Sequence, residues 1–167
     1  FHLYQNAFEP ESYLDKFRTA NKMESIYRPD ELKQKGTEIL SVKSNDEVLD
    51  IEIDNTIMKV FLKEPLKSGE SIVLDIVFDT YFGGNEEEGN VRRRMKVYEE
   101  FGNKHYNGVH WYPRISVYDR KFGWTTDQHL GKEFYGDFGC FDVELTFPEN
   151  YIVEATGFML NRGELLP

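Results

Sequence analysis

The sequence predicts an all-β protein of mostly antiparallel sheets, with one or two short helices near the N-terminus. Three observations support this fold class. Apolar residues recur at every second position through most of the chain beyond residue 37. Turn-forming sequences separate the alternating segments. Hydrophobic residues make up 40% and aromatic residues 15% of the chain, which is enough to build a folded core.

The N-terminal part is predicted to contain a strand end followed by two short helical pieces. Residues 1–8 alternate weakly, as at the end of a strand. Residues 10–20 predict an amphipathic helix, because apolar side chains recur there at helical spacing and Pro10 suits the first helical position. Residues 28–36 predict a second helical turn that a glycine closes. We expect both helical pieces to lie in a connection between two strands.

The middle of the chain changes to a period of two. Residues 39–62 predict three short strands, with a tight turn at Asp54-Asn55 between the second and the third. A further turn at residues 67–70 precedes residues 71–80, the clearest strand of the sequence. Its apolar residues fall on both faces, so we expect this strand to be partly buried on both.

Residues 81–108 are interpreted as a solvated, mobile loop. Acidic residues at 86–88 and arginines at 92–94 form charge runs flanked by glycines. The alternative, a binding patch for nucleic acid at the arginines, is opposed by the neighbouring acids and by the formal net charge of −10.

The C-terminal third is predicted to hold three strands. Residues 115–118 form the first of them after a proline. Residues 141–147 alternate cleanly, residues 148–150 form a turn, and residues 151–153 return, which together predict a β-hairpin. Residues 161–163 give another turn signal.

Composition excludes some partners and leaves the compartment open. The net charge of −10 argues against nucleic acid or an anionic membrane surface as main partner. No run approaches the length of a membrane-spanning helix, and Cys140 is the only cysteine, so no internal disulfide forms. There is no signal peptide, and because Phe1 is not an initiator methionine we expect the chain to begin after processing or trimming.

Histidines are the first candidates for metal ligands. The four are His2, His105, His110 and His129. None is followed by Glu or has a histidine four residues on, so the zinc-peptidase pattern HExxH is absent. His105 and His110 lie five residues apart and would form a metal site only with an acid such as Asp119 or Asp127. We favour the alternative that they are hydrogen-bonded structural or surface histidines.

Other catalytic motifs are also missing. There is no Gly-x-Ser-x-Gly elbow and no glycine-rich phosphate loop. Cys140, at the start of an alternating segment, is predicted to be a small buried side chain rather than a nucleophile. Nothing marks a pair of carboxylates for glycoside hydrolysis. The residues therefore predict no catalytic residue and no metal ligand in this chain.

Residues 108–157 carry a family pattern. Its parts are Trp111-Tyr112-Pro113, Tyr118-Asp119, Phe138-Gly139, the alternating Asp142 to Phe147, Pro148 and Ala155-Thr156-Gly157. This stretch resembles the N-terminal domain of aminopeptidase N-like zinc metallopeptidases, the gluzincins. The opening FHLYQNAF and the segment PLKSGESIVLDIVF are similar to the same family. The resemblance thus covers almost the whole chain.

The resemblance implies a single β domain over residues 1–167, with saddle-shaped or sandwich-like sheets, that is not itself catalytic. The family's first strands would precede Phe1, and its catalytic domain would follow Pro167, so we expect a fragment of a zinc aminopeptidase. Zinc would be held by two histidines and a glutamate of that other domain, with no cofactor here. The partners would be the protein's own catalytic domain and a peptide substrate, in the periplasm or outside the cell.

The resemblance also implies a substrate-binding role for His110, Trp111, Tyr112 and Arg114. In relatives this region helps to hold the substrate's free α-amine, often with a glutamine where His110 stands. A neutral imidazole still accepts one hydrogen bond from an ammonium, whereas an imidazolium does not. The alternatives are packing for the two aromatics and a local ion pair with Asp119 for the arginine.

Two rival functions stay open. The first is an interaction module with aminopeptidase-like architecture but no working metal site. The second is a carbohydrate-binding β-sandwich with an aromatic platform at Trp111, Tyr112 and Trp124. Fold class does not separate them, because sandwiches serve many functions.

Overall fold

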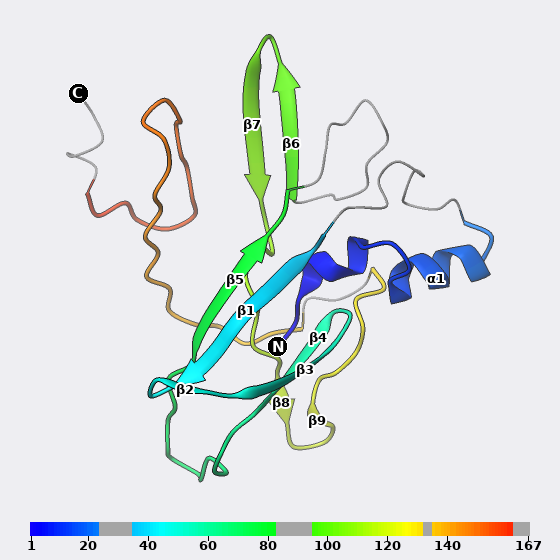
Figure 1. Cartoon of the computed structure of the whole chain (residues 1–167), viewed down its shortest axis with the longest axis vertical. Helices are drawn as coiled ribbons and strands as arrows, with labels where there is room; N and C mark the ends of the chain where they lie inside the picture. The colour runs from blue at the N-terminus through cyan, green and yellow to red at the C-terminus, as the bar shows by residue number, and fades with distance from the viewer. Residues whose placement is uncertain (24–34, 83–94, 132–134, 162–167) are drawn as a thin grey trace. The chain divides into compact units, whose positions relative to one another are not determined.

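The computed structural model describes residues 1–23, 35–82, 95–131 and 135–161 (Figure 1). Contacts divide the chain into two units, residues 1–137 (unit 1) and 138–167 (unit 2). All described helices and strands lie in unit 1. They are η1 (Tyr4–Phe8), α1 (Tyr13–Ala20), β1 (Thr37–Ser44), β2 (Glu47–Val48), β3 (Asp50–Asp54), β4 (Ile57–Phe61), β5 (Asp75–Thr80), β6 (Met95–Glu100), β7 (Asn103–Gly108), β8 (Tyr118–Asp119) and β9 (Gly123–Trp124).

The predicted fold class, all-β with antiparallel sheets and a short helix near the N-terminus, is confirmed in the described residues. Every strand pair is antiparallel, and the helical residues lie near the N-terminus. The single domain over residues 1–167 stays a prediction. No helix in the described part of the chain is long and apolar enough to cross a bilayer.

The N-terminal elements differ in detail from the prediction. Residues 4–8 form the 3₁₀ helix η1 instead of a strand end, and α1 begins at Tyr13 rather than at Pro10. Ser12 fixes this start, because its Oγ accepts a hydrogen bond from the Asp15 N–H at 3.1 Å and donates one to the Ala7 carbonyl at 2.7 Å. The predicted helical turn at residues 28–36 lies mostly outside the described residues.

The central sheet has the strand order β2-β1-β5. β1 pairs with β5 from Thr37 opposite Thr80 to Lys43 opposite Asp75, with an irregularity between Ile39 and Ser41. The predicted strand 71–80 is therefore wrong at its first four residues, which lie beyond the end of the β1 ladder. The predicted turn before it is confirmed by the bond from the Glu70 N–H to the Lys67 carbonyl, 3.0 Å.

The β3–β4 hairpin confirms the turn at Asp54-Asn55 and completes the main core. Its two strands pair from Asp50 opposite Phe61 to Asp54 opposite Ile57. The buried core cluster consists of Leu3, Val42, Leu49 and Met58. Leu3, which precedes η1, thus shares one apolar interior with β1 and β4, so the N-terminal segment is part of the core.

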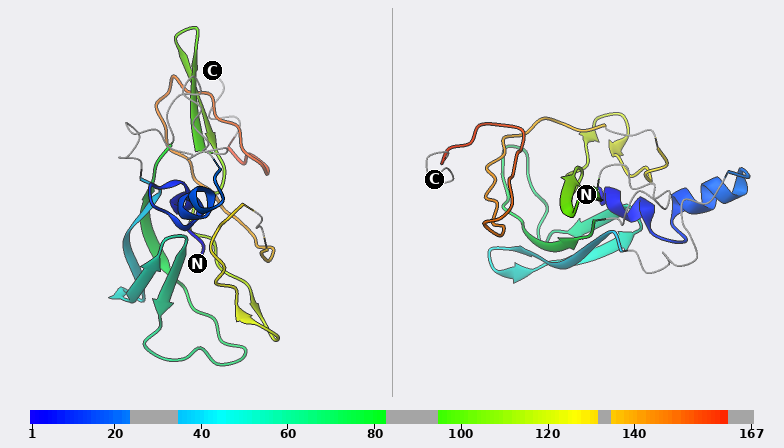
Figure 2. Two further views of the ribbon diagram at one scale, coloured as in Figure 1. Left: turned by 90° about the vertical axis from the view of Figure 1, so that its right-hand side faces the viewer. Right: turned by 90° about the horizontal axis from the view of Figure 1, so that it is seen from above.

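A second hairpin occupies residues predicted to be a loop. β6 and β7 pair along their full length, and Figure 2 shows them as a two-stranded ribbon. The loop interpretation of residues 81–108 is therefore wrong for residues 95–108. The charge runs at 86–88 and 92–94 lie outside the described residues.

Strands are fewer than predicted near the C-terminus. Of residues 115–118, only Tyr118 is in a strand, β8. In unit 2 the predicted hairpin is wrong, because none of the described residues 138–161 is in a strand. Its predicted turn is confirmed by the hydrogen bond from the Tyr151 N–H to the Pro148 carbonyl, 3.0 Å. Cys140 is exposed, which contradicts its predicted burial. The turn at 161–163 lies mostly outside the described residues.

Candidate functional site

Three histidines from distant parts of the sequence surround one tyrosine in unit 1. The Tyr4 ring stacks on His2, with centroids 5.3 Å apart and an interplanar angle of 5°. The rings of His110 and His129 meet Tyr4 edge-on at 5.0 and 5.2 Å. We call His2, Tyr4, His110 and His129 the histidine cluster. Its members come from the N-terminal segment, the segment after β7 and the segment after β9.

Backbone and side-chain bonds join the first two segments. His2 and Arg114 exchange two backbone hydrogen bonds, of 2.7 and 3.0 Å, in an antiparallel bridge. The Gln5 side-chain N–H group donates to the carbonyls of Val109 (3.1 Å) and His110 (3.4 Å). His110 has a φ of +57°, a left-handed conformation that is uncommon for residues other than glycine. These bonds hold His110 in that conformation.

The third segment is clamped to the β3–β4 turn by Gln128. Its Oε1 accepts from the Thr56 N–H (3.1 Å) and Oγ1 (2.6 Å), and its Nε2 donates to the Asp54 carbonyl (2.8 Å). The His129 N–H then donates to the Thr56 Oγ1 at 3.0 Å. Thr56 is fully buried, so the clamp sets the position of the His129 ring against Tyr4.

His2 is uncharged at neutral pH. It is buried, and burial together with the positive charges of the chain's amino group and Arg114 lowers its pKa to about 4, burial being the largest cause. Neither ring nitrogen of His2 has a hydrogen-bond partner among the described residues, and the same holds for Oε1 of buried Gln5. The interior beside His110 therefore contains hydrogen-bond acceptors that those residues do not use.

Trp111 and Tyr112 form a pair of their own. The Trp111 ring stacks on Phe78 of β5, with centroids 6.2 Å apart, and meets the Tyr112 ring edge-on at 5.3 Å. Trp111 is still 38% exposed. Packing on the sheet, the alternative to substrate contact, thus accounts for one side of this ring and leaves the other accessible.

The Arg114 side chain reaches the end of unit 1. Its guanidinium donates to the Asp137 carbonyl at 3.4 Å and lies so close to Gly136 that a Cβ there would overlap it. Asp119, the acid predicted to pair with it, instead accepts from the N–H groups of Lys121 (2.8 Å) and Phe122 (2.7 Å).

The structure thus brings His110 and Arg114 together with His2, whereas Trp111 and Tyr112 contact each other. The sequence did not single out Tyr4, a member of the cluster, or Gln5, which bonds the His110 backbone, and it gave no reason to group His2 with His129. Sequence separations above 100 residues leave no spacing signal for such a contact.

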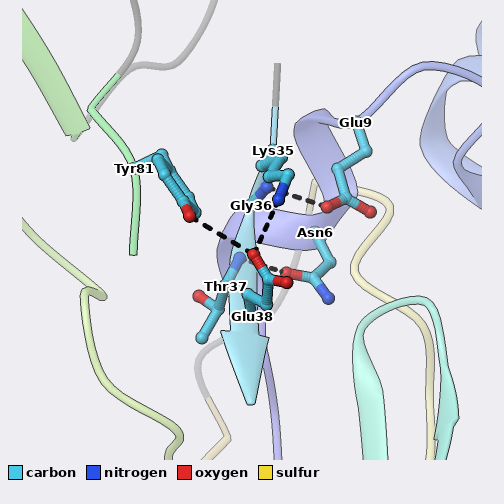
Figure 3. A network of polar contacts seen from close by, with 7 residues as sticks. All are labelled: Asn6, Glu9, Lys35, Gly36, Thr37, Glu38 and Tyr81. Atoms are coloured by element: carbon cyan, nitrogen blue, oxygen red, sulfur yellow. Dashed lines mark hydrogen bonds and ion pairs between the residues drawn. The ribbon is translucent and has the colours of Figure 1, made fainter. Parts of the chain in front are cut away.

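A separate polar network joins η1 to the start of β1 (Figure 3). The Asn6 Oδ1 accepts from the Thr37 N–H (2.6 Å), and Glu9 accepts from the Gly36 N–H (2.8 Å). Lys35 pairs with Glu38 at 2.8 Å and thereby lowers the pKa of that exposed carboxyl. The network borders an open pocket of about 330 Å³. These groups bond one another, so we assign the network to anchoring.

Metal ligands do not gather in the described residues. No three His, Cys, Asp or Glu side chains lie close enough there to hold a metal ion. His105 lies on β7, opposite Tyr98 of β6, whereas His110 follows that strand and contacts Tyr4.

Comparisons with protein-family models, curated proteins and solved structures found no match for this chain.

Proposed function

We propose that this chain is the N-terminal, non-catalytic β domain of a zinc-dependent aminopeptidase-like peptidase. It would wall the active-site cleft and help to position the free N-terminus of a peptide substrate. Its partners would be the protein's own catalytic domain, which would hold the zinc, and the peptide. We assign no zinc ligand and no catalytic residue to the chain itself, and we expect a periplasmic or extracellular location.

The observation that supports this proposal is the fixed segment at residues 110–114. Its backbone is tied to His2 and Gln5, and it belongs to the sequence stretch that resembles the family. It presents a partly exposed Trp111 next to His110. A wall of a cleft needs such a rigid backbone, because a substrate-positioning group must be held in place before the substrate binds.

The chemistry of the segment suits an ammonium group. A neutral imidazole has one nitrogen that accepts a hydrogen bond, and an amide oxygen such as that of Gln5 accepts as well. A peptide's α-ammonium donates three hydrogen bonds. We therefore propose His110 as the residue that contacts the substrate amine, with Gln5 fixing its backbone.

The test uses the complete product of the gene and an aminoacyl anilide substrate. His110→Ala should raise KM about tenfold or more, because a hydrogen bond to a charged group contributes about 1.5–3 kcal/mol. His105→Ala, an exposed histidine on β7, is the matched control and should leave KM unchanged. Unchanged kinetics in His110→Ala would remove this residue from the site.

A second measurement tests the division of labour. The 167-residue chain alone, supplied with zinc, should not hydrolyse the anilide, and the complete gene product should do so only with zinc. Zinc-dependent hydrolysis by the chain alone would contradict the proposal. A complete gene product without aminopeptidase activity would favour the interaction module.

One observation favours carbohydrate binding as the second candidate. Tyr118 and Trp124, paired across β8 and β9, contact edge-on at 5.1 Å and are 64% and 56% exposed. Exposed aromatic side chains can pack on sugar rings. Because Trp124 contacts Tyr118 while Trp111 contacts Tyr112, these two rings replace the predicted platform of Trp111, Tyr112 and Trp124 in this proposal. A glycan array on which Trp124→Ala abolishes binding while Trp111→Ala preserves it would support this function.

A further inference from the structure

The turn of the β6–β7 hairpin places a phenylalanine where both backbone and solvent disfavour it. Glu100 pairs with Asn103, so Phe101 and Gly102 form a two-residue turn with φ values of 53° and 77°. Positive φ at both positions is typical of a type I′ turn, which favours Asn, Asp or Gly. Phe101 is also 93% exposed. Both the left-handed backbone and the exposed ring are unfavourable in the isolated chain.

Another turn in the same protein shows the expected residues. The β1–β2 connection is also a two-residue turn with positive φ, and it consists of Asn45 (49°) and Asp46 (64°). The two turns share their backbone geometry but not their residue types. Phe101 therefore does not result from a demand of the turn.

The hairpin holds this side chain away from the other described strands. β6 and β7 pair with each other and with no other described strand. At the base Met95 is fully buried, and Phe82 contacts Tyr106 edge-on at 5.3 Å. At the tip, residues 99–104 are all exposed. The base is thus fixed while the tip is accessible, which is the geometry of an anchoring side chain.

We infer that Phe101 is the apolar anchor of an interaction surface that inserts into a pocket of a partner protein, and that the pocket is rimmed by Lys or Arg. Single aromatic anchors in fitted pockets carry much of the energy of protein interfaces. The tip bears Glu99 and Glu100, and Lys104, 3.7 Å from Glu99, compensates only one of these charges. With a net charge of −10, the chain suits a basic rim and not an anionic membrane.

The first experiment tests whether the Phe101 side chain stabilises the folded chain. Phe101→Asn supplies a residue that the turn favours, so it should raise the urea midpoint of the chain. The matched control is Phe122→Asn in the β8–β9 connection, because Phe122 is 73% exposed but has ordinary φ and lies under the Lys121 ammonium at 4.5 Å. It should not raise the midpoint. A lower midpoint for Phe101→Asn would show that the ring serves the fold and overturn the inference.

The second experiment identifies the partner. A photoreactive phenylalanine analogue replaces Phe101 in the complete protein in its source cells, and the same analogue at position 122 is the control. Support requires an adduct specific to position 101, its attachment site in an apolar pocket with Lys or Arg at the rim, and at least tenfold weaker binding of the purified partner by Phe101→Asn. Adducts with lipid, with a second copy of the chain, or with the same proteins at both positions would overturn the inference.

Discussion

His2 shows how one buried side chain makes the protein sensitive to acid. Its ring stacks on Tyr4, its backbone pairs with Arg114, and neither ring nitrogen is bonded among the described residues. The groups around it include His129 and the positive Arg114, while Asp127 is the opposing negative charge. Protonation would place a charge in this interior without a described acceptor, so the neutral form is the one that fits.

We predict that acid destabilises the fold through His2. Its pKa is about 4 in the folded chain against 6.5 ordinarily, so the unfolded chain binds the proton first. The contribution of neutral His2 to the free energy of unfolding is complete above pH 6.5. It is lost as the pH falls from 6.5 to about 4 and does not change further below that pH. At about 1.4 kcal/mol per pH unit, the loss approaches about 3 kcal/mol.

Urea unfolding at pH 7, 6, 5 and 4.5 measures this effect, with His2→Phe as the comparison. Phenylalanine keeps a ring on Tyr4 but has no titrating nitrogen. The free energy of unfolding of the variant should fall less with acid than that of the parent chain. Parallel pH profiles would show that other groups, such as His129, carry the acid response.

At the scale of elements, strand patterns succeeded where the partner strand was close in sequence. The alternation that predicted β3 and β4 is confirmed, because Asn55, in a left-handed conformation at φ 50°, lets the chain return on itself. Residues 141–147 alternate equally well but have no partner strand in the described chain. A period of two predicts which side chains share a face, and a strand also needs a neighbour to bond.

The features that the sequence does not predict also have identifiable physical reasons. The sequence predicts a loop where the β6–β7 hairpin lies, because the turn begins with Phe101 instead of Asn or Gly and the strands are rich in charged residues. The sequence does not predict the histidine cluster because residues 2, 110 and 129 are far apart in the chain and meet only in the folded structure. Of the predicted substrate site, His110 belongs to the cluster and Arg114 pairs with the backbone of His2.

The clamp between the β3–β4 turn and residue 128 gives a prediction at this scale. Thr56→Val removes the hydroxyl that donates to Gln128 and accepts from the His129 N–H. It should lower the free energy of unfolding by about 1–3 kcal/mol, because buried groups lose their partners. Thr80→Val, which removes a half-buried hydroxyl bonded to Thr37 at 3.1 Å, should cost less. Urea unfolding compares the two, and equal losses would contradict a special role of the clamp.

At the scale of the whole molecule, the apolar residues of the two units have different surroundings. The buried core clusters, built around Leu3 and around Ala7, lie in unit 1. In unit 2, large apolar side chains are exposed over the described residues, among them Phe138, Ile152 and Phe158. A single domain over residues 1–167 would need these side chains in a common core. A single domain and two separate units predict different stabilities when residues 138–167 are removed.

We expect residues 1–137 to fold without residues 138–167. Because both described core clusters and the histidine cluster belong to unit 1, the shortened chain should keep the cooperative urea transition, and its midpoint should change little. It should also keep the acid response of His2, which depends only on contacts within unit 1. Urea transitions at pH 7 and pH 5, followed by near-ultraviolet circular dichroism, measure both. Loss of the cooperative transition would instead show that unit 1 does not fold without residues 138–167.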